Sequence, residues 1–129
     1  MDRTKTRIET VHTYRDARGW LFEPVDDAQI GGTRNVHVVL TEPGHVRGNH
    51  RHRLGTEISV VTGPALVRLK EDGQIRDIEV PAGETWRFTV PPGVTHAYRN
   101  PGPGPMLLVG FNTELHDPAS PDVVREEIL

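Results

Sequence analysis

Glycine and proline recur along this chain at short intervals, and this punctuation constrains the fold more than any other feature of the sequence. The 129 residues include 13 Gly and 11 Pro, and both residue types interrupt helices. Turn-forming pairs such as Gly63-Pro64 and Asp72-Gly73 separate short apolar segments, as turns do between neighbouring strands. The pattern disfavours a helical protein and predicts about eight to ten short strands joined by turns.

The segments between these turns alternate in the manner of β-strands. In 85–90, Trp86, Phe88 and Val90 share one face, and in 65–70 Ala65 and Val67 begin a similar row. Residues 121–129 have only weak helical or edge-strand character. We therefore expect an all-β fold of two antiparallel sheets, a sandwich or a barrel. Further strands are expected over 35–40, 57–62, 74–80 and 106–111.

Length and composition exclude several classes of protein. A chain of 129 residues has the size of one domain, so we expect a single domain over residues 1–129. The absence of cysteine excludes disulfides and thiolate chemistry. A net charge of −3 indicates no nucleic-acid partner. No apolar run is long enough for a membrane helix or a signal peptide, so we expect no membrane partner and a cytoplasmic location.

Four residues have the chemistry and spacing of metal ligands. His50 and His52 are two positions apart, so on a strand both side chains project from one face, with Cα atoms about 6.6 Å apart. Glu57 follows on the next expected strand, where a hairpin would bring its carboxylate alongside the pair. His96 follows a rigid Pro-Pro-Gly turn. This nitrogen and oxygen set suits one divalent ion, with zinc, iron, manganese, nickel and copper all left open.

The spacing of these residues resembles the two motifs of the cupin superfamily. Residues 44–63 read Gly-x5-His-x-His-x4-Glu-x5-Gly, and residues 91–100 read Pro-x-Gly-x2-His-x3-Asn. The first motif has five residues rather than six before its last glycine, and the leading glycine of the second, Gly83, lies two residues further from Pro91 than usual. The resemblance covers 44–100. It implies a cupin jelly roll with His50, His52, Glu57 and His96 as metal ligands.

A narrower similarity indicates sugar chemistry. Residues 46–52 (VRGNHRH) and 16–21 (DARGWL) resemble segments of nucleotide-sugar epimerases and ketoisomerases built on cupin folds. The segment 112–122 is similar to the tail of metal-containing cupin modules in capsular-sugar biosynthesis. This similarity implies that Arg47 contacts a substrate diphosphate or carboxylate. The candidate proton carriers are Tyr98, His37 and His116.

The resemblance leaves the reaction open. In metal-free sugar epimerases the histidine of the Arg-Gly-x-His segment is the catalytic base, whereas here the equivalent His50 is expected to bind metal. The best interpretation is a metal-dependent epimerase or isomerase of a sugar-nucleotide or related carbonyl substrate. The alternatives are a non-haem iron dioxygenase and a non-catalytic module that binds a small molecule, with or without metal. Family behaviour also implies a homodimer.

Overall fold

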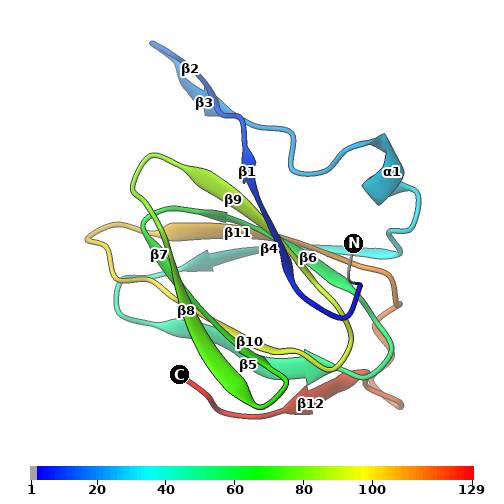
Figure 1. Cartoon of the computed structure of the whole chain (residues 1–129). Coiled ribbons are helices and arrows are strands. Elements are labelled where there is room, and N and C mark those ends of the chain that lie inside the picture. Colours follow the sequence, from blue (N-terminus) through cyan, green and yellow to red (C-terminus); the bar gives the residue numbers. More distant parts are fainter. Residues whose placement is uncertain (1–2) are drawn as a thin grey trace.

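The computed structural model describes residues 3–129, and within them it forms two five-stranded sheets and a separate two-stranded hairpin (Figure 1). The first sheet has the order β1-β9-β6-β11-β4, and the second has the order β12-β5-β10-β7-β8. The strands are β1 (Arg7–Val11), β2 (Tyr14–Asp16), β3 (Gly19–Leu21), β4 (Asn35–Thr41), β5 (Val46–His52), β6 (Glu57–Thr62), β7 (Ala65–Glu71), β8 (Gln74–Val80), β9 (Thr85–Val90), β10 (Thr95–Arg99), β11 (Met106–Asn112) and β12 (Val123–Arg125).

All strand pairs are antiparallel, and consecutive strands often cross from one sheet to the other. The chain passes from β5 to β6, from β6 to β7 and from β10 to β11 in this way, through short turns rich in glycine and proline. This is the jelly-roll architecture of the cupin fold, so the predicted fold class is confirmed.

The β7–β8 hairpin shows how local sequence produces one of these turns. Asp72 and Gly73 both have positive φ, at 50° and 76°, the conformation required at both central positions of a type I′ turn. The preceding strand buries Val67 and Leu69 completely, while Arg68 between them pairs with Asp77 across the hairpin. The alternation predicted for residues 65–70 is therefore present.

Apolar side chains fill the space between the sheets and leave one end of it polar. The larger cluster includes Val67, Leu69, Phe88 and Met106, all 2% exposed or less. A smaller cluster joins Ile58, Val60 and Phe111. His96 and Glu57 lie in the same interior, at 0% and 4% exposure. A buried ionisable pair of this kind requires partners that compensate its desolvation.

Three features go beyond what the sequence pattern predicts. The row Val36, Val38 and Leu40 on β4 faces outward and is exposed, because β4 is an edge strand whose inner face carries His37 and Val39. A short helix, α1 (Asp27–Ile30), starts at a capping box in which the N-cap residue Asp26 and Gln29 exchange hydrogen bonds. Residues 123–125 form the edge strand β12 beside β5.

No helix within residues 3–129 has the length and apolarity needed to cross a membrane.

Candidate metal centre

An irregularity in β5 directs its two histidines into the space between the sheets. The register against β10 shifts between His96 and Ala97, so that His50 pairs with His96 and Gly48 pairs with Ala97. Gly48 and Asn49 both have positive φ at this bulge. A Cβ atom at Gly48 would lie 2.7 Å from the carbonyl oxygen of His96. Glycine therefore permits the close approach of β5 to β10 that brings two imidazoles together.

Glu57 reaches this cluster from the opposite sheet. It is the first residue of β6, and residues 53–56 carry the chain across from β5. The expectation of a hairpin between these two strands is wrong, because β5 and β6 belong to different sheets and do not pair. The jelly-roll crossing achieves the same proximity by another route. The carboxylate lies across the gap between the sheets from the histidine-bearing strands.

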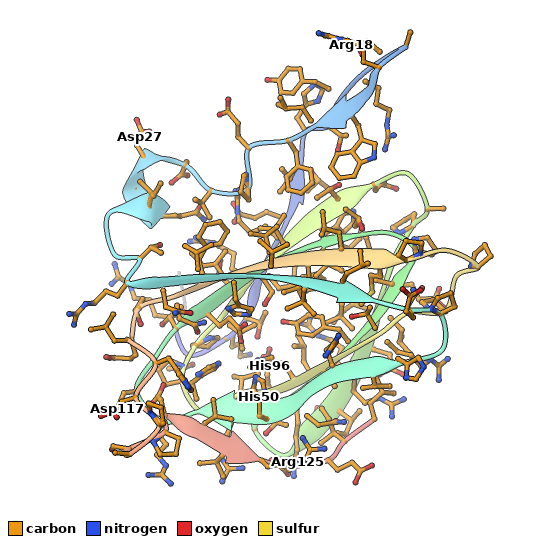
Figure 2. The ribbon with its side chains drawn as sticks, turned by 180° about the vertical axis from the view of Figure 1, so that it is seen from behind. Arg18, Asp27, His50, His96, Asp117 and Arg125 are labelled. Carbon is orange, nitrogen blue, oxygen red and sulfur yellow. The ribbon has the colours of Figure 1, made fainter. Side chains whose placement is uncertain are left out.

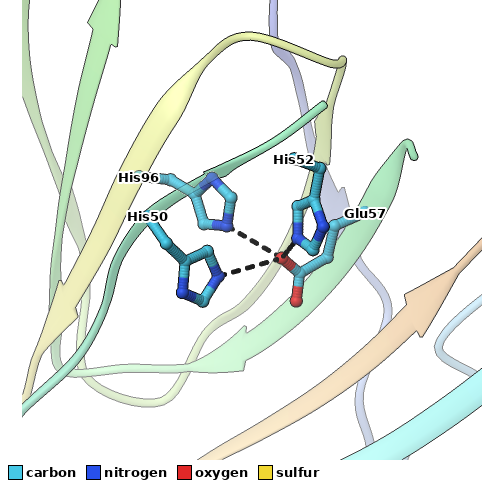
Figure 3. A group of neighbouring side chains, drawn as sticks. All are labelled: His50, His52, Glu57 and His96. Carbon is cyan, nitrogen blue, oxygen red and sulfur yellow. Dashed lines mark hydrogen bonds and ion pairs between the residues drawn. The ribbon is translucent and has the colours of Figure 1, made fainter. Parts of the chain in front are cut away.

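The four predicted ligands meet around one carboxylate oxygen (Figure 3). Glu57 Oε2 lies 2.8 Å from His96 Nε2, 2.9 Å from His52 Nε2 and 3.9 Å from His50 Nε2. One ligand atom from each of the four residues lies within 4.8 Å of all the others. Figure 2 shows His50 and His96 together in the interior of the molecule. The structure thus brings together the four side chains that the motif spacing indicated.

The contacts of the His96 ring indicate which of its two nitrogens carries a proton. His96 Nδ1 lies 3.0 Å from the carbonyl oxygen of Val94, which only accepts, so Nδ1 carries the proton and donates it. With Nδ1 protonated, His96 donates from Nε2 to Glu57 as an imidazolium, whereas in a neutral imidazole the Nε2 lone pair points at the carboxylate, which is repulsive. A divalent ion among these atoms would turn that repulsion into coordination, and neutral imidazole and carboxylate are its usual ligands. The donor set therefore fits a metal ion.

The same cluster shifts two pKa values. Burial acts to raise the pKa of the Glu57 carboxyl, but hydrogen bonds from His37, His50, His52 and His96 outweigh it and hold that pKa well below its usual value. Burial acts to lower the pKa of His52, but the hydrogen bond and negative charge of Glu57, together with Asp122, raise it overall. Both shifts show that the interior favours positive charge beside Glu57.

The cluster forms part of the wall of a cleft of about 380 Å³ that is lined mainly by polar residues. Neighbouring strands contribute Asn35 and Asn112, which are directly paired between β4 and β11. Glu114 and His116 follow β11 and line the same cleft. A molecule entering from solvent therefore meets amides and a carboxylate beside the imidazoles. Sequence reasoning gave no individual role to Asn35, Asn112 or Glu114, although Asn112 and Glu114 lie in the segment 112–122 that resembles the tail of metal-containing cupin modules.

His37 is the proposed proton carrier that lies nearest the cluster. Its Nε2 is 3.5 Å from Glu57 Oε1, the carboxylate oxygen that faces away from the closest ligand contacts. The imidazole lies over Gly110 of β11, where a Cβ atom would overlap it. His37 is also partly exposed, with 39% of its side chain accessible. It can therefore contact both the cluster and a molecule in the cleft.

The other predicted site residues lie in different surroundings. His116 is exposed and lines the cleft. Tyr98 is 2% exposed, with its ring 5.9 Å from that of His96, and burial followed by the charge of Glu57 raises its pKa well above the usual value. Arg47 donates to Thr41 Oγ1 and to the carbonyl oxygen of Leu40. Of the described residues, those that line the cleft include neither Tyr98 nor Arg47, and their roles stay predictions.

Fold and cluster together define a jelly-roll protein with a three-histidine, one-carboxylate centre at the edge of a polar cleft. The model of the polysaccharide biosynthesis C-terminal domain matches residues 14–124. The chain belongs to this family. No match was found among the curated proteins.

Several solved structures are similar to this chain. The capsular polysaccharide assembling protein CapF from Staphylococcus aureus is 27% identical, with a TM-score of 0.67 over 92% of this chain, which spans 34% of CapF. QdtA, a sugar 3,4-ketoisomerase from Thermoanaerobacterium thermosaccharolyticum solved with TDP, is 20% identical, with a TM-score of 0.67 over 94% of this chain and 88% of its own. A 3,4-ketoisomerase from Helicobacter canadensis is 18% identical, with a TM-score of 0.72 over 95% of this chain and 92% of its own. The two ketoisomerases share the fold.

Proposed function

We propose that this chain is a metal-dependent isomerase or epimerase that acts on a keto-sugar attached to a nucleotide. The observation that carries the proposal is the convergence of three imidazoles and Glu57 at the edge of a polar cleft. The family is one of polysaccharide biosynthesis. Structural neighbours described as sugar 3,4-ketoisomerases, one of them in complex with TDP, support the same substrate class.

The cleft presents polar side chains of the kind that bind a sugar ring. Asn35 and Asn112 each offer an amide donor and an acceptor, and Glu114 offers a carboxylate. Such groups bind hydroxyls from several directions and fix the orientation of a ring. A volume of about 380 Å³ is sufficient for one sugar ring. We therefore place the sugar in the cleft and the nucleotide toward solvent.

The residues that would hold the ion are His50, His52, Glu57 and His96. A divalent ion bound there supplies Lewis acidity, which favours negative charge on a nearby carbonyl oxygen. The chain itself must supply the base. With His50 engaged as a ligand, His37 is the imidazole placed both beside the cluster and in the cleft.

The proposed reaction consists of proton transfers alone. His37 takes the proton from the carbon next to the carbonyl, and the electron pair of that C–H bond forms the enolate. Return of a proton to the same carbon from the opposite face gives the epimer, for which His116 is the second carrier available in the cleft. Transfer of the neighbouring hydroxyl proton to the former carbonyl oxygen, with protonation at the former carbonyl carbon, gives the isomeric ketone. Neither outcome needs an oxidant.

The proposal is tested by metal analysis and by proton exchange. Purified protein should contain about one divalent ion per chain, and a TDP-linked 4-keto-6-deoxy sugar incubated in D₂O should gain deuterium next to its carbonyl, as read by NMR. H37A should lose this exchange and keep its metal, whereas H45A, at an exposed turn histidine, should behave like wild type.

Other results would contradict the proposal in distinct ways. Full activity of metal-free protein would refute metal dependence. Stoichiometric oxygen uptake would favour the dioxygenase alternative. Metal binding without exchange on any nucleotide-linked keto-sugar would favour a binding module.

A further inference from the structure

Asp122 is held in place at the start of the C-terminal segment by three backbone groups. Its Oδ1 accepts a hydrogen bond from Leu54 N at 2.8 Å, and its Oδ2 accepts one from Gly55 N at 2.9 Å. Its own carbonyl oxygen accepts from Arg53 N at 2.8 Å. A carboxylate fixed on both oxygens and on its backbone has little rotational freedom. These contacts set its direction relative to the loop that connects β5 and β6.

That direction places Asp122 against one of the proposed ligands. Asp122 Oδ2 lies 3.4 Å from His52 Nδ1, and the side chains are 17% and 10% exposed. The other ring nitrogen, His52 Nε2, lies 2.9 Å from Glu57 Oε2. The His52 ring therefore spans two carboxylates, one on each side, and only the Glu57 side belongs to the ligand cluster.

We propose that Asp122 is a positioning residue for the metal centre. A carboxylate beside Nδ1 favours the proton on that nitrogen, which leaves the Nε2 lone pair free to coordinate. It also makes the imidazole a stronger ligand and fixes the ring plane. This inference rests on the proposed metal centre and adds to it a residue that touches neither the ion nor the substrate.

The position of Asp122 links the C-terminal segment to the centre. Val123, the next residue, pairs with His52 in the β12–β5 ladder, and Figure 1 shows β12 running alongside β5. Further along, Asn49 Oδ1 accepts from the backbone N–H groups of Ile128 and Leu129. The segment is thus docked along the strand that carries two ligands. Docking of this segment brings the Asp122 carboxylate to His52.

The test compares Asp122 variants with matched controls. D122A removes the carboxylate, and D122N keeps one acceptor oxygen without the charge. E126Q alters a residue of the same segment that binds Arg51, Lys70 and Thr95 and has no hydrogen bond to any of the four proposed ligands. T113V removes the hydroxyl that accepts from Thr56 N in the 53–56 loop. These controls separate loosening of the segment or the loop from loss of the His52 contact.

Zinc affinity of each full-length variant is measured by competition with a chromophoric chelator. D122A should bind zinc about 10- to 100-fold more weakly than wild type, D122N should lie between them, and both controls should remain within about twofold. NMR of the zinc-loaded protein gives a second readout. The His52 Nδ1–H resonance should be protected from exchange in wild type and lose that protection in D122A, with D122N providing the comparison if D122A fails to fold.

The outcomes distinguish failure of the positioning role of Asp122 from failure of the proposed metal centre. Unchanged zinc affinity in both Asp122 variants, or an equal loss in T113V, would overturn the positioning role. Absence of stoichiometric zinc binding by wild type would instead overturn the proposed metal centre.

Discussion

At the scale of single residues, one carboxylate organises the site. Glu57 is 4% exposed and has four histidines around it, three at Oε2 and His37 at Oε1. A buried anion is costly unless positive charge or donors surround it. The histidines supply those donors in the metal-free protein, and an ion would supply the charge directly. The arrangement explains why the interior of this fold tolerates a charged group.

Replacing Glu57 with glutamine tests this role. E57Q keeps nearly the same shape but removes the negative charge and one oxygen ligand, so we expect zinc affinity to fall at least about 100-fold. The measurement is chelator competition, with E114Q in the cleft wall as the control. Equal zinc affinity in E57Q and wild type would show that Glu57 is not a ligand.

Gly110 makes room for the proposed base. Because a Cβ atom there would overlap the His37 imidazole, G110A should displace this ring from Glu57. We expect the rate of deuterium exchange to fall about tenfold or more while the zinc content is kept. G32A is a suitable control, since an added Cβ at Gly32 has open space around it. Unchanged exchange in G110A would exclude His37 as the base in this position.

At the scale of elements, the turns and bulges decide which side chains meet. The β5 bulge aligns His50 with His96, and the β7–β8 turn completes the sheet that carries β10. Asn100 performs a similar task after β10, since its amide donates to the carbonyl oxygens of Thr41 and Gly104. These few residues fix how the strands around the site lie relative to one another.

The β7–β8 turn gives a stability prediction. Gly73 has a φ of 76°, so an alanine there is strained, and G73A should lower the free energy of unfolding by about 1 kcal/mol. G104A, where an added Cβ meets no atom within 4 Å, should change it by less than half as much. Urea unfolding measures both. A neutral G73A would contradict the assignment of a type I′ turn.

At the scale of the whole molecule, the site joins the two sheets. The histidines come from β5 and β10 of one sheet, and they face a carboxylate from β6 of the other sheet. Binding of an ion to this set stabilises the folded state, because the unfolded chain does not hold the four ligands together. Metal content and resistance to unfolding should therefore change together.

The two shifted pKa values set the pH dependence of the metal-free protein. The lowered pKa of Glu57 contributes stability above pH about 4.3, and this is lost as the pH falls through the folded value. The raised pKa of His52 contributes stability that is complete below pH about 6.5 and is lost as the pH rises through its folded value. Stability of metal-free protein should therefore be highest between these limits, and added zinc should extend it to higher pH.

Thermal unfolding of the metal-free and zinc-loaded forms between about pH 2 and pH 8 would measure this dependence. E57Q is the control, since it should lose the decline at acid pH. A metal-free protein that gains stability steadily from pH 5 to 8 would contradict the argument.

The exposed apolar row on β4 bears on the oligomeric state of the protein. Val36, Val38 and Leu40 are each more than half exposed on an edge strand, and exposed apolar faces favour association. The homodimer implied by the family resemblance stays a prediction. Sedimentation velocity at micromolar concentration should show twice the chain mass, and a monomer would contradict it.

Local patterns in the sequence located the strands β4, β6, β7, β8, β9 and β11, the turns between neighbouring segments and the candidate ligands. Alternation along 65–70 and the Asp72-Gly73 pair predict backbone conformation, because both depend on neighbours a few residues away. Spacing alone also marked His50, His52, Glu57 and His96 as a set. The exposure of the β4 row was beyond such patterns, since an outer sheet face and a buried one share the same period.

Only the tertiary structure decided how distant segments meet. It places Glu57 in the facing sheet, His37 over Gly110 and Asp122 beside His52. Each of these contacts depends on which strands pair and in which register, and on how the two sheets face one another. Those choices are settled by the packing of the whole core, because local backbone preferences are compatible with many pairings.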